Sequence, residues 1–141
     1  MANKEKSIHK FIKIFRREHK ELAKRLKRCQ ELDISRKKNR RQVKGVLKDL
    51  RKHLQQETVH VSPLLAPLAM EDPKLGRFLK KTRQELRDVN LFTDYMYDKY
   101  RRKDATIGYP EDIERMVEIF TRRVDIEERI LFKRFKKEGN S

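Results

Sequence analysis

Four long stretches of this chain place apolar side chains at alternating steps of three and four residues. Phe15, Leu22 and Leu26 follow this spacing in the first stretch, and Leu75 and Leu79 follow it in the third. Such spacing lines apolar side chains along one side of an α-helix. Only 36% of the residues are hydrophobic, so the core has to be confined to narrow stripes. Long helices packed side by side meet this requirement, whereas a sheet buried on both faces does not.

Prolines mark where the predicted helices begin and end. We expect helices over residues of about 6–30, 36–61, 73–101 and 110–137. Pro63 should end the second helix, because proline lacks the N–H that a helix interior needs, and residues 61–70 should form a packed connection. Pro73 and Pro110 suit the first turns of the following helices. Short connections make neighbouring helices antiparallel, so the prediction is an all-α, up-down-up-down four-helix bundle forming a single domain over residues 1–141.

Charge and cysteine content limit where such a bundle works and what it contacts. Lys and Arg outnumber Asp and Glu by 38 to 22, which gives a net charge of +16. This excess fits solvated helix faces, and it also predicts non-specific attraction to nucleic acid or an acidic partner. Cys29 is the single cysteine, so no disulfide forms within the chain. The sequence has no apolar run near the length of about 20 residues that a membrane span needs, and no signal sequence, so we expect a cytoplasmic protein.

Four ionisable residues occupy stripe positions where an apolar residue is expected: His19, His53, Glu57 and Glu127. A buried ionisable group is costly unless it is paired, hydrogen-bonded or bound to a metal. The spacing of His53 and Glu57 puts an imidazole and a carboxylate one helical turn apart on one face, and this donor pair suits iron, zinc or manganese. His60 shares a face with Glu57 and is a spare ligand candidate. The alternative is a set of hydrogen-bonded histidines with each Glu paired to a facing Arg.

Three stretches of the sequence resemble the hemerythrin and HHE cation-binding family. They read FRREHKEL from residue 15, HLQQE followed by VSP from residue 53, and EERILF from residue 127. The resemblance implies a four-helix bundle in which His19, His53, Glu57 and Glu127 are ligands of iron. Family members use a complete ligand set to hold two bridged irons that bind dioxygen or act as sensors.

Two positions depart from that family pattern. The histidines expected on the third and fourth helices are replaced by Arg83 and Arg123. A guanidinium is a permanent cation and cannot ligate a metal. If both Arg side chains turn inward, they can pair with Glu57 and Glu127 and complete a core without metal. If both turn outward, the remaining donors are left for a single ion.

Two functions follow from these patterns. The first is a hemerythrin-like metal-binding bundle with a reduced or mononuclear iron site, serving sensing, storage or oxygen binding. The alternative is a metal-free bundle with an Arg–Glu core that acts as a basic interaction or nucleic-acid-associated module. The sequence contains no catalytic Ser-His-Asp order, Gly-rich phosphate loop or Cys cluster, so we expect a protein that is not an enzyme.

Overall fold

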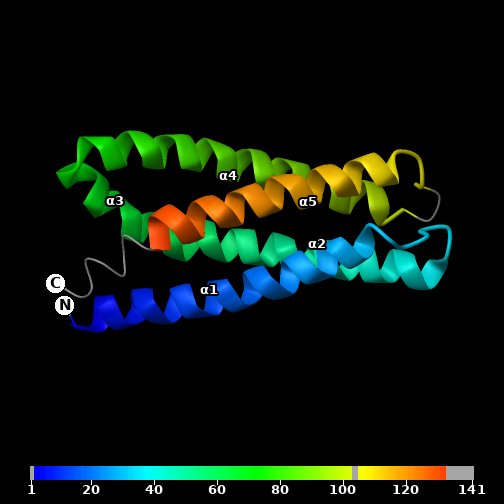
Figure 1. Ribbon diagram of the computed structural model, residues 1–141, viewed down its shortest axis with the longest axis horizontal. Coiled ribbons are helices and arrows are strands. Elements are labelled where there is room, and N and C mark those ends of the chain that lie inside the picture. The colour runs from blue at the N-terminus through cyan, green and yellow to red at the C-terminus, as the bar shows by residue number, and fades with distance from the viewer. Residues whose placement is uncertain (1, 103–104, 133–141) are drawn as a thin grey trace.

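Helices arranged in a closed ring make up the fold. The computed structural model describes residues 2–102 and 105–132, and within these ranges it contains helices and no strand. The long helices of this part are α1 (Ala2–Cys29), α2 (Lys37–Gln56), α4 (Pro73–Tyr100) and α5 (Tyr109–Ile126). They lie side by side (Figure 1), and α1 and α4 each contact both α2 and α5. The predicted all-α, up-down-up-down four-helix bundle is therefore confirmed.

The segment after α2 differs from the prediction. The helix does not stop before Pro63, because a π-helical turn, η1 (Glu57–Val61), leads directly into a further helix, α3 (Ser62–Glu71). Pro63 is the second residue of α3, and a first turn tolerates proline because its N–H has no partner within the helix. α3 packs on α4 at the end of the bundle where the N-terminus lies (Figure 1).

The ends of the two later helices are fixed by local contacts. Asp72 caps α4, because its carboxylate accepts from the backbone N–H groups of Lys74 (3.0 Å) and Leu75 (3.3 Å). Gly108 precedes α5 with a φ of 81°, a left-handed conformation that favours glycine. Tyr109 then donates its hydroxyl to the backbone oxygen of Cys29 at 2.7 Å. This bond ties the start of α5 to the end of α1.

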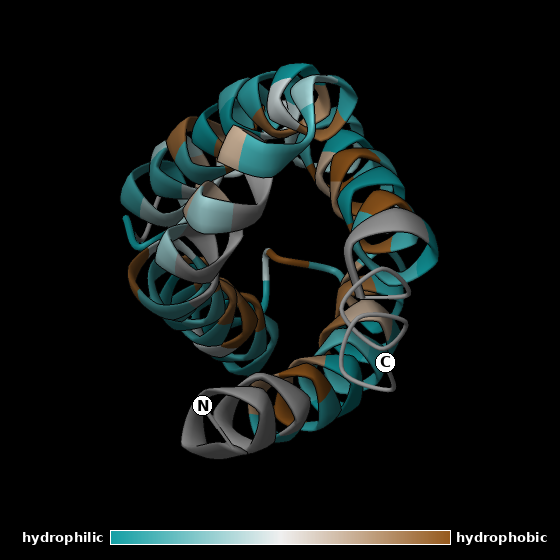
Figure 2. Cartoon of the chain, turned by 90° about the vertical axis from the view of Figure 1, so that its left-hand side faces the viewer, coloured by the Kyte–Doolittle hydropathy of each residue, from teal (hydrophilic) through white to brown (hydrophobic). Residues whose placement is uncertain are grey.

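The apolar stripes face the inside of the ring. In the end-on view the hydrophobic parts of the ribbons turn mainly inward and the hydrophilic parts outward (Figure 2). The main hydrophobic cluster runs from Leu22 on α1 to the end of the bundle where the α1–α2 and α4–α5 loops lie. Phe15, Leu75 and Leu79 are buried too, but they lie outside that cluster. The four predicted ionisable residues lie between these two apolar groups along the helices.

α5 continues into a second π-helical turn, η2 (Glu127–Phe132), and the last part of the predicted fourth helix, residues 133–137, lies outside the described residues. Within the described residues, no helix has the length and apolar character needed to cross a membrane.

Candidate metal centre

The four predicted ligands come together inside the bundle. His19, His53, Glu57 and Glu127 are only 2%, 3%, 3% and 1% exposed. The Nε2 atom of His19 lies 3.2 Å from Oε2 of Glu127, and Nε2 of His53 lies 3.9 Å from Oε2 of Glu57. The two imidazole rings meet edge to face with centroids 4.8 Å apart. The structure thus gathers two imidazoles and two carboxylates from separate helices into one buried cluster.

Each carboxylate of this cluster stands where an α-helix widens into a π-helical turn. Glu57 is the first residue of η1, and Glu127 is the first residue of η2. A π-helical turn re-aims the side chains that follow it, and such turns are frequent at functional sites. The arrangement is the same on both helices, which makes an accidental irregularity a poor explanation for it.

Two further carboxylates hold the outer sides of the histidine rings. Nδ1 of His53 lies 2.5 Å from Oε2 of Glu18, and Nδ1 of His19 lies 3.5 Å from Oε1 of Glu128. An ionised carboxylate only accepts, so Nδ1 is the donor in both bonds, and in a neutral imidazole Nε2 is then the atom that can ligate. Metal-binding histidines commonly have such carboxylate partners.

The sequence analysis missed the roles of Glu18 and Glu128. The available signal was that each directly adjoins a predicted ligand. A neighbour on a helix is turned by about 100° from the ligand itself, so it can reach a ring presented by an adjacent helix instead of entering the core.

Burial sets the protonation of the histidines. It lowers the pKa of His19 below its usual value, although the charge of Glu57 and the bond to Glu128 act in the opposite direction. Burial likewise lowers the pKa of His53, and the hydrogen bond to Glu18 offsets part of this. Both rings are therefore neutral at pH 7, the form that a metal requires.

Arg123 lies inside the cluster and holds both carboxylates. Its Nε donates to Oε1 of Glu127 at 2.6 Å, its Nη2 donates to Oε1 of Glu57 at 3.2 Å, and its Nη1 donates to the backbone oxygen of Thr82 at 2.8 Å. Burial alone would lower the pKa of this guanidinium, but the charges of Glu127 and Glu57 outweigh it and raise the pKa. Arg123 is therefore a fixed cation that joins α5 to η1 and α4.

Glu57 and Glu127 each have a second carboxylate oxygen, Oε2, that Arg123 does not bond. Oε2 of Glu57 and Oε2 of Glu127 are buried and have no hydrogen-bond partner among the described residues. Burial, followed by the charge of Glu127, raises the pKa of Glu57 well above its usual value. A hydrogen bond between the two carboxyl groups contributes to this raised pKa, but when both groups are ionised the two buried oxygens have no donor, which is costly. Both oxygens face the side of the cluster that holds the histidine Nε2 atoms. A cation at this place would satisfy both oxygens.

Arg83 and His60 do not belong to the cluster, and for Arg83 this corrects the expected register. The stripe of α4 runs through Leu79, Thr82 and Leu86, so Thr82 faces the centre while Arg83, one residue further on, is exposed. The two Arg side chains therefore behave differently, since Arg123 turns inward and Arg83 turns outward. His60 is exposed as well, and its ring stacks on Phe11 with a centroid distance of 5.2 Å, so it is no spare ligand in this arrangement.

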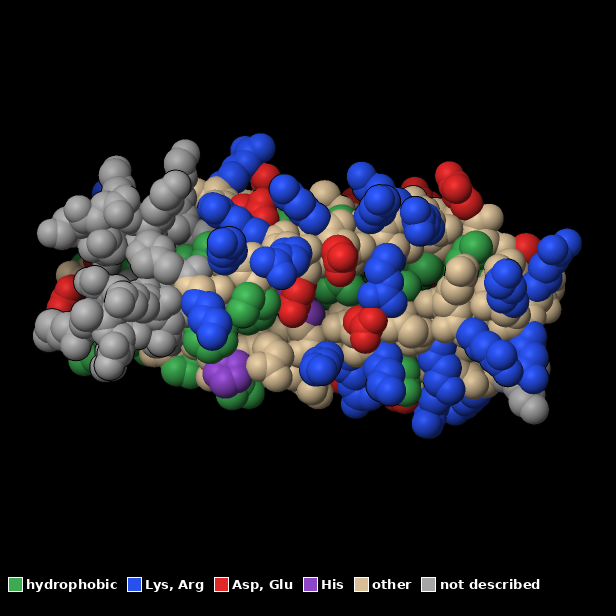
Figure 3. Space-filling model, turned by 90° about the horizontal axis from the view of Figure 1, so that it is seen from below, with side chains coloured by type: hydrophobic (Ala, Val, Ile, Leu, Met, Phe, Trp, Pro, Cys, Tyr) green, Lys and Arg blue, Asp and Glu red, His purple; other side chains and the backbone are tan. Residues whose placement is uncertain are grey.

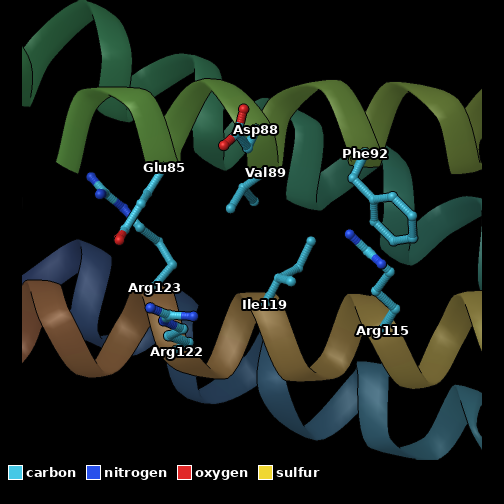
Figure 4. Close-up of a pocket in the computed structure, with 8 residues that line it drawn as sticks. All are labelled: Glu85, Asp88, Val89, Phe92, Arg115, Ile119, Arg122 and Arg123. Carbon is cyan, nitrogen blue, oxygen red and sulfur yellow. The ribbon is translucent and has the colours of Figure 1, made fainter. Parts of the chain in front are cut away.

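Two pockets reach the cluster from the surface. One of about 230 Å³ lies between α4 and α5, where Val89 and Ile119 face each other and Arg123 extends from α5 toward α4 (Figure 4). The other, of about 250 Å³, lies between α1 and α2, and its lining includes His53 and Glu18. One pocket therefore borders the cluster on its arginine side, and the other borders it on its histidine side.

Two observations bear on the number of ions that this donor set could hold. Among the described residues, no group of three or more His, Cys, Asp or Glu side chains is placed so that it could hold a metal ion. The His19–Glu127 distance of 3.2 Å lies within the spacing of about 3–3.5 Å between two ligands that each stand about 2.1 Å from one ion, whereas the His53–Glu57 distance of 3.9 Å exceeds it. The Oε1 atoms that a second ion would need are occupied by Arg123.

Comparison with known proteins agrees with this geometry. Residues 10–135 match the model of the hemerythrin HHE cation binding domain. Neither the curated proteins nor the solved structures gave a match to the chain. The matched range includes every residue of the cluster and all four long helices, except for the first turns of α1. This chain belongs to the hemerythrin HHE cation-binding domain family.

Proposed function

We propose that this protein binds one iron ion through His19, His53, Glu57 and Glu127, and that it serves as a sensing or oxygen-binding domain. The observation that carries the proposal is that only some polar atoms of the cluster have partners within the protein. The outer atoms of both imidazoles are held by carboxylates, and one oxygen of each glutamate is held by Arg123. Two carboxylate oxygens without donors are left facing the two histidine rings.

The side chains around the ion have separate tasks in this proposal. Glu18 and Glu128 orient the imidazoles and fix the proton on Nδ1. Arg123 orients both carboxylates and supplies a permanent positive charge. Iron would supply redox chemistry with dioxygen, which the side chains of the cluster lack. Storage fits poorly because one ion per chain gives little capacity, and we propose a binding role without catalysis.

Metal content measured after anaerobic loading with ferrous iron tests this function. We expect about one iron per chain, lost in His53→Ala and retained in His60→Ala, because only His53 belongs to the cluster. His60 is a matched control, since it is a histidine on the same helical segment with an exposed ring. About two irons per chain would contradict the role given to Arg123.

A metal-free bundle is the second candidate, and the Arg123 network favours it. The guanidinium already neutralises part of the charge of Glu57 and Glu127, so the core is held together without an ion. In that case the domain would act as a basic interaction or nucleic-acid-associated module. A helical, folded protein that takes up no iron under the same loading conditions would select this candidate over the first.

A further inference from the structure

The positive charge of the chain is concentrated in its first half. Residues 1–61 contain 20 Lys and Arg against 7 Asp and Glu, whereas residues 62–141 contain 18 against 15. Most of the net charge of +16 therefore belongs to α1, α2 and the loop between them. Figure 3 shows Lys and Arg side chains gathered toward the right-hand end of this view, the end that carries the α1–α2 loop in Figure 1.

A row of exposed cations follows one face of α2. Lys37, Arg41, Lys44 and Lys48 are spaced by four, three and four residues, so they share a face of the helix, and all four are exposed. None of them makes an ion pair with the residues that the structure describes. The acidic residue nearest to the row, Asp49, is paired with Arg25 of α1 at 2.7 Å. We call these four residues the α2 row.

The beginning of the α2 row forms one wall of a strongly basic pocket. This pocket of about 200 Å³ is lined by Lys37, Arg40, Arg41 and Lys44 from α2, by Tyr100 at the end of α4, and by Arg101 and Arg102 from the turn that follows α4. Among the residues that the structure describes, no carboxylate lines this pocket. A concave surface with charges of one sign focuses the electrostatic field and raises the local concentration of counter-ions. The pocket is therefore shaped and charged for an anionic group.

A second, larger pocket adjoins the first and shares Arg41 with it. It has about 490 Å³ and lies between the end of α1 and the beginning of α2, with Arg28 and Lys38 at its sides and Leu32 and Val46 among its apolar lining. Within the described part of the chain, no carboxylate lines this second pocket either. α2 also begins without a side-chain cap and without an acidic residue in its first turn, so its helix dipole adds positive potential at this end.

We propose that the α2 row and the two pockets beside it form a binding surface for the phosphate backbone of a nucleic acid. The α2 row extends over about 16 Å from Lys37 to Lys48 at 1.5 Å per residue, and its last member, Lys48, lies beyond the basic pocket, which suits a polymer of phosphates better than one small anion. A membrane surface fits less well, because the apolar side chains of α2, including Val43, Leu47 and Leu54, are buried and none is exposed to enter lipid. The surface lies at the opposite end of α2 from His53, so it is separate from the candidate metal centre.

Neutralising the α2 row tests this proposal. We compare the triple variant Lys37→Gln, Arg41→Gln, Lys44→Gln with a control triple variant Lys80→Gln, Lys81→Gln, Arg83→Gln, which removes the same charge from exposed positions of α4. Fluorescence anisotropy measures the binding of the whole 141-residue chain to a labelled DNA duplex of about two helical turns over a range of salt concentrations.

The expected result is a loss of affinity confined to the α2 variant. Its affinity should fall at least about tenfold, and the slope of log K against log salt should shrink by about 2–3, because each phosphate contact contributes about 0.9 to that slope. The control variant should keep most of the wild-type affinity and slope. Circular dichroism checks that both variants remain helical, which the exposure of all six side chains predicts.

Three results would overturn the proposal. An equal loss in the control variant would show that total charge, and not the α2 row, attracts the duplex. Displacement of the duplex by polyglutamate as effectively as by unlabelled duplex would identify an acidic protein as the partner. Binding to anionic phospholipid vesicles through the α2 row, with no binding to the duplex, would identify a membrane surface instead.

Discussion

Arg123→Met offers the sharpest test of how the core is held together. Methionine keeps the length and apolar volume of the arginine stem but removes the charge and the three donors. Those donors now reach Glu127 at 2.6 Å, Thr82 at 2.8 Å and Glu57 at 3.2 Å, all in a place where the arginine is 6% exposed. The substitution therefore leaves two buried carboxylates without their cation and one backbone oxygen without its donor.

The expected cost follows from that count of broken contacts. Removing one partner of a buried ion pair costs about 3–5 kcal/mol, because the remaining charge stays buried without compensation. One kcal/mol shifts the Tm of a domain of this size by about 3 °C, so we expect a fall of about 10–15 °C. Denaturant unfolding followed by circular dichroism measures the free energy directly. Arg122→Met is the control, since Arg122 is exposed and its loss should change the stability by less than about 0.5 kcal/mol.

A double variant separates electrostatics from packing. In a Glu57→Gln background the site carries one negative charge fewer, so Arg123→Met should cost at least about 1 kcal/mol less than in the wild type. The cost should also shrink as the pH falls from 7, because burial and the charge of Glu127 raise the pKa of Glu57, and a protonated Glu57 no longer needs the cation. A cost below about 1 kcal/mol, equal in both backgrounds, would refute the ionic account and leave Arg123 as a packing residue.

Three further predictions concern other parts of the molecule. Glu18→Gln should weaken iron binding about 10–100-fold without unfolding the bundle, because it loosens the ring of one ligand, and competition with a chelator measures this against Glu21→Gln as the control. Cys29 is buried, and burial raises the pKa of its thiol to about 11, so this thiol should resist alkylation at pH 8. Between pH 8 and pH 10 the thiol ionises only in the unfolded protein. Over this range the protein should therefore lose about 1 kcal/mol of stability relative to the Cys29→Ala variant. Equal rates of alkylation in native and denatured protein would contradict its burial. Gly108→Ala should destabilise the protein by about 1 kcal/mol because of the φ of 81°, whereas Gly45→Ala, whose new Cβ meets nothing closer than 3.9 Å, should stabilise α2 by about 0.5–1 kcal/mol in thermal unfolding.

The bundle was predictable from the sequence because its helices carry regular apolar stripes. The polar interruptions of those stripes also identified the buried cluster, since His19, His53, Glu57 and Glu127 all lie where their stripes place them. The course of the chain after residue 57 was not predictable in this way. The apolar residues around Pro63 have no clear period, and whether a proline ends a helix depends on whether it falls in a first turn, which the π-helical turn at Glu57 decides here.

The outcome for the two arginines shows a further limit of sequence reasoning. Arg83 was assigned to a ligand position by family resemblance. The stripe of α4 already placed Thr82 on the buried face, so helical periodicity was the better guide there. Arg123 lies on the buried stripe of α5, three residues after Phe120 and four before Glu127. Helical period therefore places Arg123 inside the bundle, whereas its partners Glu57 and Thr82 lie on other helices and could not be inferred from the period of α5.

Charge balance around Arg123 explains why one ion is expected and not two. Glu57 and Glu127 bring two negative charges when ionised, the two buried histidines are neutral, and Arg123 returns one positive charge. One divalent ion would leave the inner cluster with a single positive charge, which the nearby carboxylates of Glu18 and Glu128 can offset. A second divalent ion would add two more positive charges beside a buried guanidinium, where like charges repel more strongly than in water. In the proposed site, the arginine would therefore both replace the second ion's charge and oppose its entry.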